Sequence, residues 1–109
     1  MSIMTENWIK IGTIGDIPLR GARHVHSGDK TIAIFRNAHN KIFALEDKCP
    51  HGGCPISNGI VHDSSVTCPI HNWVISLETG EALGADEGQT LAFPVQMDGD
   101  KILLSLSVK

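Results

Sequence analysis

Short runs of β-branched and apolar residues, separated by glycine, asparagine and aspartate, follow one another along the chain. This is the pattern of strands joined by tight turns. The clearest pair is 31–36 and 41–45, which predicts a hairpin across 37–40. Further strands are expected at 8–11, 19–26, 60–61, 66–67, 73–75, 91–95 and 101–106, with the last two forming another hairpin and 83–90 a loop. Because no stretch keeps a helical apolar period, we expect an all-β fold of antiparallel sheets in a sandwich or barrel.

Composition narrows the class of protein. The 109 residues, 41% of them hydrophobic, predict a single domain over 1–109 with one modest core. The net charge is −3 and the charges are scattered, which argues against nucleic-acid binding. The sequence has no apolar run long enough to span a membrane and no basic and apolar leader at its start, so we expect a cytoplasmic protein without membrane contact.

Cysteine and histidine recur in two short motifs. Cys49 and His51 stand two positions apart, and Cys68 and His71 stand three apart. Proline follows each cysteine and restricts it toward extended backbone, and glycines follow His51. Each motif follows a predicted strand directly, as a rigid site requires.

Two loops that each supply one thiolate and one imidazole match the ligand set of a Rieske [2Fe–2S] centre. In such a centre two cysteines bind one iron and two histidines bind the other. The irons lie side by side, so a loop that sends its cysteine to one iron sends its histidine to the neighbour. We therefore predict Cys49, His51, Cys68 and His71 as the cluster ligands and metal site, with no catalytic side chain elsewhere.

Two other interpretations of these residues stay open. Single cysteines and histidines in small domains are often just packed in the core. Two cysteines and two histidines also form a structural zinc set, although zinc fingers usually pair like with like, whereas each motif here is mixed. The third cysteine, Cys54, is expected to be a packed small residue, and His39 and His62 are expected to be exposed and not ligands.

The motifs resemble those of Rieske-type ferredoxin domains over nearly the whole chain. Within that family the chain is most similar to the small subunits of assimilatory NAD(P)H-dependent nitrite reductase. The resemblance rests on C-P-H-G-G-C-P-I-S at 49–57, G-I-V at 59–61, C-P-I-H-N-W at 68–73, L-E-T-G-E at 77–81, D-E-G at 86–88 and F-P-V at 93–95. It implies the Rieske (ISP-like) fold of three stacked antiparallel sheets, with a two-loop cluster-binding subdomain at about 46–78. It also implies that Cys49 and Cys68 bind the buried iron, and His51 and His71 the outer one.

The resemblance implies one-electron transfer as a nitrite reductase subunit, in the reduction of nitrite to ammonium. The chain lacks a nucleotide fingerprint, so it is not expected to catalyse alone. The implied partner is a large subunit carrying FAD and sirohaem. Two alternatives remain. One is a free Rieske ferredoxin that supplies a ring-hydroxylating oxygenase, and the other is a non-redox interaction module with zinc or vestigial ligands.

The chain departs from respiratory Rieske proteins at three positions. Those proteins link their ligand loops by a disulfide, and here Cys54 occupies the first place but Ile70 the second. They also donate hydroxyl hydrogen bonds to the cluster from positions that Trp73 and Ile75 occupy here. Fewer donors stabilise the reduced cluster less, which predicts a potential in the lower part of the Rieske range.

Overall fold

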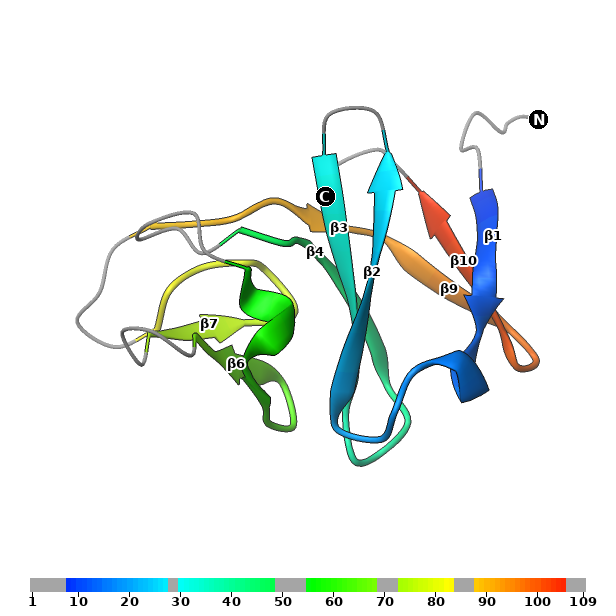
Figure 1. Ribbon diagram of the computed structural model, residues 1–109, viewed down its shortest axis with the longest axis horizontal. Coiled ribbons are helices and arrows are strands. Elements are labelled where there is room, and N and C mark those ends of the chain that lie inside the picture. Colours follow the sequence, from blue (N-terminus) through cyan, green and yellow to red (C-terminus); the bar gives the residue numbers. More distant parts are fainter. Residues whose placement is uncertain (1–7, 28–29, 49–54, 69–72, 84–87, 106–109) are drawn as a thin grey trace.

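Three antiparallel sheets build the computed structural model, which describes residues 8–27, 30–48, 55–68, 73–83 and 88–105 (Figure 1). The first sheet has the order β1-β10-β9, the second β2-β3-β4-β8, and the third β5-β6-β7. The strands are β1 Trp8–Thr13, β2 Gly21–Ser27, β3 Lys30–Arg36, β4 Ile42–Glu46, β5 Ile60–Val61, β6 Ser65–Thr67, β7 Val74–Ser76, β8 Ala92–Phe93, β9 Val95–Asp98 and β10 Lys101–Ser105. Two short 3-10 helices join them, η1 Ile14–Asp16 and η2 Ile56–Asn58.

The central sheet explains the continuous apolar run in β3. Four consecutive residues, 32–35, are buried there. Ile32 and Ile34 belong to one core cluster, which the side chains of β10 complete, while Ala33 and Phe35 belong to a second cluster with residues of β5, β6 and β7. Both faces of the sheet are therefore covered, and a strand covered on both faces needs apolar residues at every position. The all-β antiparallel prediction and the hairpin of β3 and β4 are confirmed.

The predicted strand at 91–95 is not one strand. Ala92 and Phe93 pair with β4 in the central sheet, whereas Val95 begins β9, which pairs with β10. Pro94 lies between them and has no N–H to donate to a ladder. The prediction of a hairpin with 101–106 was therefore right for β9 and β10 but wrong for 91–93, because the chain changes sheets at the proline.

A buried asparagine joins the central sheet to the third one. Asn37, in the turn between β3 and β4, is 2% exposed. Its side-chain amide donates to the carbonyl of Asp63, in the turn between β5 and β6, and its oxygen accepts from the N–H groups of His39 and Lys41, each at 2.9 Å. One side chain thus closes its own turn and ties it to a hairpin 26 positions away.

Replacing Asn37 with alanine is expected to lower the free energy of unfolding by about 2 kcal/mol, because buried hydrogen-bonding groups lose their partner. Urea titration measures this. His39→Ala is the matched control, since the His39–Asp63 ion pair in the same turn is 71% and 78% exposed and a pair so exposed contributes little. Equal effects of the two substitutions would contradict the role given to Asn37.

Candidate functional site

Cys68 directly follows β6 and is fully buried, with 0% exposure. Its backbone N–H donates to the carbonyl of Trp73 at 2.7 Å, one step beyond the paired residues Thr67 and Val74. The β6–β7 ladder thus continues to the two ends of the segment 69–72 and sets their separation. His71 and Ile70 lie in that segment, outside the described residues.

The other predicted motif lies between β4 and η2. Cys49, His51 and Cys54 fall in 49–54, outside the described residues. The ends of this segment are described. Asp47 follows β4, and its carboxylate accepts from the N–H of Ser57 at 2.8 Å and from the hydroxyl of Ser57 at 2.7 Å.

The helix η2 closely follows the segment 49–54 and β6 leads into the segment 69–72, and the two elements pack against each other. Ile56, the first residue of η2, is fully buried and belongs to the same core cluster as Cys68. Gly59 follows η2, and a Cβ placed on it would lie 2.2 Å from the carbonyl oxygen of Thr67, the neighbour of Cys68. The backbone that closes the first segment therefore rests on the strand that leads into the second.

These observations allow a test of whether an iron–sulfur cluster fits. Cys68 is enclosed by apolar side chains, which suits a thiolate that binds an inner iron and shields it from water. Within the described ranges no group of three His, Cys, Asp or Glu side chains forms a metal site. Of the predicted ligands, Cys68 alone is described, so the set of Cys49, His51, Cys68 and His71 stays a prediction that the position and burial of Cys68 fit.

The other histidines and the tryptophan are placed as follows. His39 is exposed beside Asp63, with 3.4 Å between Nε2 and the carboxylate. His62 is exposed, and its Nε2 lies 2.8 Å from the Thr67 hydroxyl. Trp73 is half-buried against the core cluster of Cys68, and Ile75 is fully buried in it. Neither Trp73 nor Ile75 carries a hydroxyl, so neither can donate the hydrogen bond to the cluster that respiratory Rieske proteins donate from these positions.

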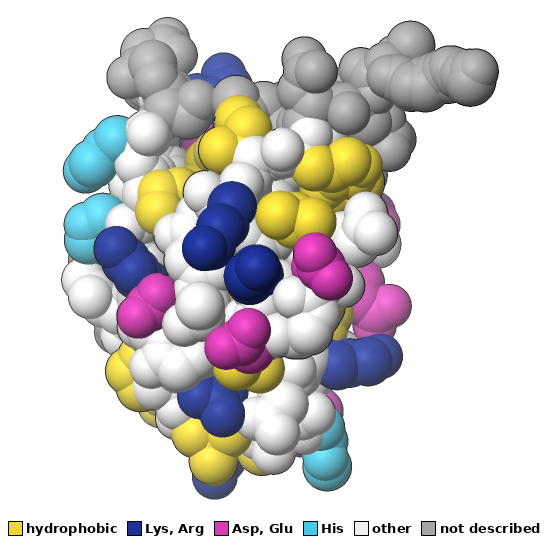
Figure 2. Space-filling model, turned by 90° about the vertical axis from the view of Figure 1, so that its right-hand side faces the viewer, with side chains coloured by type: hydrophobic (Ala, Val, Ile, Leu, Met, Phe, Trp, Pro, Cys, Tyr) yellow, Lys and Arg dark blue, Asp and Glu magenta, His cyan; other side chains and the backbone are white. Residues whose placement is uncertain are grey.

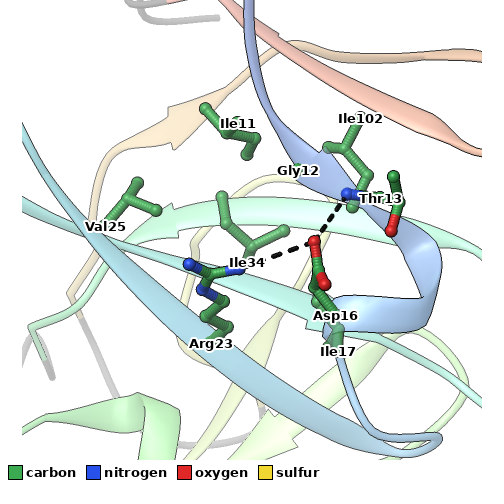
Figure 3. Close-up of a pocket in the computed structure, with 9 residues that line it drawn as sticks. All are labelled: Ile11, Gly12, Thr13, Asp16, Ile17, Arg23, Val25, Ile34 and Ile102. Carbon is green, nitrogen blue, oxygen red and sulfur yellow. Dashed lines mark hydrogen bonds and ion pairs between the residues drawn. The ribbon is translucent and has the colours of Figure 1, made fainter.

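Figure 3 shows a cavity between β1, η1, β2, β3 and β10, at the other end of the molecule from β5–β7. Its volume is about 10 Å³, room for at most one water. Asp16 lies at its edge, accepts from the N–H of Thr13 at 2.9 Å and pairs with Arg23 at 3.7 Å. The Thr13 N–H, more than the Arg23 charge, holds the pKa of the Asp16 carboxyl below its ordinary value of 3.8. This cavity is too small for a substrate.

The lowered pKa of Asp16 predicts an acid-dependent contribution to stability. Because the folded-state pKa lies below the unfolded one, this contribution is present above pH 3.8 and is lost as the pH falls through the folded-state pKa. The difference in unfolding free energy between the wild type and Asp16→Asn should therefore shrink as the pH drops from about 5 to about 2. Thermal or urea unfolding across this range measures it, and a difference that is independent of pH would contradict the assignment.

The surface at that end carries charges of both signs. Figure 2 views the molecule from the side of β1 and shows lysine and arginine side chains interspersed with aspartate and glutamate, around separate groups of hydrophobic side chains. Among the described residues of this face, the lysine and arginine side chains do not form the continuous basic patch that is typical of nucleic-acid binding. In the described ranges, the structure contains no helix that is long and apolar enough to cross a membrane.

Sequence reasoning missed two polar residues next to the candidate site, Asp47 and Ser57. Both are residue types that cap helix starts, and they flank the first motif. Residue type alone, however, did not predict that they contact each other. Their contact could not be recognised in the sequence, because the two residues are ten positions apart and η2 has a single turn.

Comparison with known proteins identifies one family, and its relatives include ferredoxin components of dioxygenase systems. The family model described as Rieske [2Fe–2S] domain matches residues 7–95. The ferredoxin component of a naphthalene 1,2-dioxygenase system from Pseudomonas aeruginosa is 30% identical over 105 residues, covering 95% of this chain and all of the relative. The anthranilate 1,2-dioxygenase ferredoxin subunit of Burkholderia cepacia is 36% identical over 81 residues, covering 71% of this chain and 74% of the relative.

Two solved structures with different assigned roles share the fold. A chain assigned as an NADH-dependent nitrite reductase small subunit from Mycobacterium tuberculosis superposes with a TM-score of 0.84 at 20% identity, covering 95% of this chain and 98% of the other. A chain from a complex of oxygenase and ferredoxin in carbazole 1,9a-dioxygenase gives a TM-score of 0.82 at 22% identity, covering 94% and 95%. At these identities the likeness shows the fold and does not separate the two functions.

Proposed function

The chain belongs to the Rieske [2Fe–2S] domain family, and from this premise we propose that it passes single electrons to or within a larger redox enzyme. When bound, a Rieske cluster accepts and donates one electron. We propose Cys49 and Cys68 as the ligands of its inner iron, and His51 and His71 as those of its outer iron. The burial of Cys68 at the end of β6 supports this assignment.

The partner we propose is the large sirohaem and FAD subunit of NAD(P)H-dependent nitrite reductase. The observation that carries this proposal is the D-E-G motif at 86–88, together with the small size of the chain, which resemble the small subunits of that enzyme. This motif ends the stretch 77–88, which begins with L-E-T-G-E. The described parts of this stretch form an addition to the third sheet, where Ala82 bridges to Ile75 and Glu81 bridges to Gln89. Ala82, within the described part of this stretch, therefore lies beside β7, the strand that follows the second ligand segment, whereas residues 86 and 87 of the D-E-G motif lie outside the described residues.

Gly80 shows how closely that addition is fitted. It has a φ of +82°, and its carbonyl accepts from the N–H of Thr90 at 2.9 Å. A Cβ at this position would lie 2.2 Å from the carbonyl oxygen of Thr90, so the turn requires glycine. A turn so closely packed, in the addition that borders β7, is suited to present a defined surface to a partner subunit.

A second function has support of its own. The ferredoxin component of the naphthalene dioxygenase system from Pseudomonas aeruginosa matches over its full length at 30% identity. A free ferredoxin that supplies a ring-hydroxylating oxygenase would use the same ligands and the same buried thiolate. The two proposals differ in the partner, so the test has to be made on the partner.

The test is co-purification together with gene deletion in the source organism. The tagged chain should bring down a large subunit that shows sirohaem absorption, and the deletion should abolish NAD(P)H-dependent nitrite reduction. The wild-type gene should restore that activity, and the Cys68→Ser gene should not. Intact nitrite reduction, with an oxygenase component recovered and its electron supply lost, would replace the first function by the second. Loss of neither activity would overturn both.

The midpoint potential is expected in the lower part of the Rieske range of about −150 to +300 mV. The physical reason is that Trp73 and Ile75 supply no hydroxyl hydrogen bond to the cluster, so its reduced state is stabilised less. A redox titration followed by visible circular dichroism measures the potential. A midpoint well above zero would contradict this expectation.

A further inference from the structure

Asp47 and Ser57 hold together the two ends of the first ligand segment. Both carboxylate oxygens of Asp47 are used, one by the Ser57 N–H at 2.8 Å and the other by the Ser57 hydroxyl at 2.7 Å. Hydrogen bonds to a charged group are short and stronger than neutral ones. We propose that this pair, the Asp47–Ser57 clasp, is a positioning device that keeps Cys49 and His51 in place for the cluster. This inference rests on the proposed ligand set.

The clasp caps the first turn of η2. This helix begins after Pro55, which provides no capping side chain, and the N–H of Ser57 in the first turn has no partner within the helix. A capping side chain normally comes from the residue just before the helix. Here it comes from ten positions upstream, so capping the helix and closing the segment are the same interaction.

Both members of the clasp are anchored in different parts of the fold. The N–H of Asp47 donates to the carbonyl of Thr31 at 2.7 Å, which ties it to β3 in the central sheet. Ser57 is flanked by the fully buried Ile56, and Gly59 beyond it lies against Thr67 of β6. The clasp therefore connects the central sheet to β6, the strand that leads into Cys68, at the point where the first ligand segment begins and ends.

Under the proposed ligand set, a disulfide within the chain cannot hold the ends of the first ligand segment together. The chain has three cysteines, and if Cys49 and Cys68 bind iron, Cys54 is left without a partner in the chain. Holding the ends of a loop together lowers the entropy that its ligands lose on binding. It also keeps ligand geometry within the narrow range that a metal centre tolerates.

The experiment compares cluster retention in four variants. Asp47→Asn weakens both hydrogen bonds, Ser57→Ala removes the hydroxyl one, and Ser57→Thr keeps a hydroxyl and serves as the conservative rescue. Asp16→Asn is the matched control, since Asp16 accepts from a backbone N–H at the start of η1 at 2.9 Å, at the end of the molecule opposite β5–β7. The measurements are the rate of iron release to a ferrous chelator, the electron paramagnetic resonance spectrum of the reduced protein, and the unfolding midpoint of each variant.

Iron release should be about tenfold faster in Asp47→Asn, the loss expected for one charged hydrogen bond. It should be several-fold faster in Ser57→Ala, and close to the wild-type rate in Ser57→Thr and Asp16→Asn. The reduced spectrum of Asp47→Asn should broaden, a change that altered global stability does not produce.

Wild-type release rates and spectra in both Asp47→Asn and Ser57→Ala would overturn the clasp, as would an equal acceleration in Asp16→Asn. If Asp47→Asn fails to fold, Ser57→Ala and its threonine rescue decide the outcome by the same criteria. A wild-type protein that binds no iron would instead overturn the ligand set, and this is seen before any variant is made.

Discussion

Replacing Cys68 with serine is expected to reduce the iron content from about two atoms per chain to near zero. A thiolate is the ligand that iron–sulfur clusters use, and a serine hydroxyl stays protonated at neutral pH. Cys68 is fully buried directly after β6, so the substitution removes a thiolate ligand from inside the core. Iron and labile sulfide analysis after anaerobic purification, with the visible spectrum, measures the loss.

The control for this prediction is Val66→Thr. Val66 lies two residues before Cys68, on β6, is also fully buried and belongs to the same core cluster. Both substitutions bury a hydroxyl at a cost of about 1–3 kcal/mol, so both should lower the unfolding midpoint. Val66→Thr should nevertheless keep its iron. Equal loss of iron in the two variants would mean that Cys68 acts through packing and not as a ligand.

The regular part of the fold was readable from the sequence because it follows from local patterns. The apolar run of β3 and the turn at 37–40 predicted a hairpin, which the register from Ile32–Glu46 to Arg36–Ile42 confirms. Periodicity could not show that the chain changes sheets at Pro94, because both of its halves look like a strand. Which sheet a strand joins depends on contacts between residues far apart in the sequence.

The candidate site also has a part that the sequence predicted and a part that it did not. The two motifs named four ligands by residue type and spacing, and this set stays a prediction for which the buried Cys68 is the described support. The side chains that hold the ligand segments and turns in position could not be predicted from the sequence. The clasp joins residues ten positions apart, and Asn37 joins turns that are 26 positions apart. Such contacts follow from how the sheets pack, and no local pattern encodes them.

Substitution of Gly59 is expected to have the second large effect, and its cause is steric. The φ of −81° at this position is open to any residue, so alanine brings no backbone strain. A Cβ, however, would lie 2.2 Å from the carbonyl oxygen of Thr67, 3.1 Å from that of Ile56 and 3.0 Å from a methyl group of Val66. Two of these atoms are backbone and cannot turn away, so η2 or β6 has to move.

Gly59→Ala is therefore expected to lower the free energy of unfolding by about 2–3 kcal/mol, in the range of overpacked cores. It should also accelerate iron release, because the displaced residue, Thr67, precedes Cys68. Gly15→Ala is the matched control, since a Cβ there meets a single atom, the Thr13 hydroxyl oxygen, at 3.9 Å. Urea unfolding and chelator-monitored iron release of the two variants measure the difference. If Gly59→Ala were as stable as Gly15→Ala, then η2 would not rest on β6, and the two ligand segments would not share one rigid base.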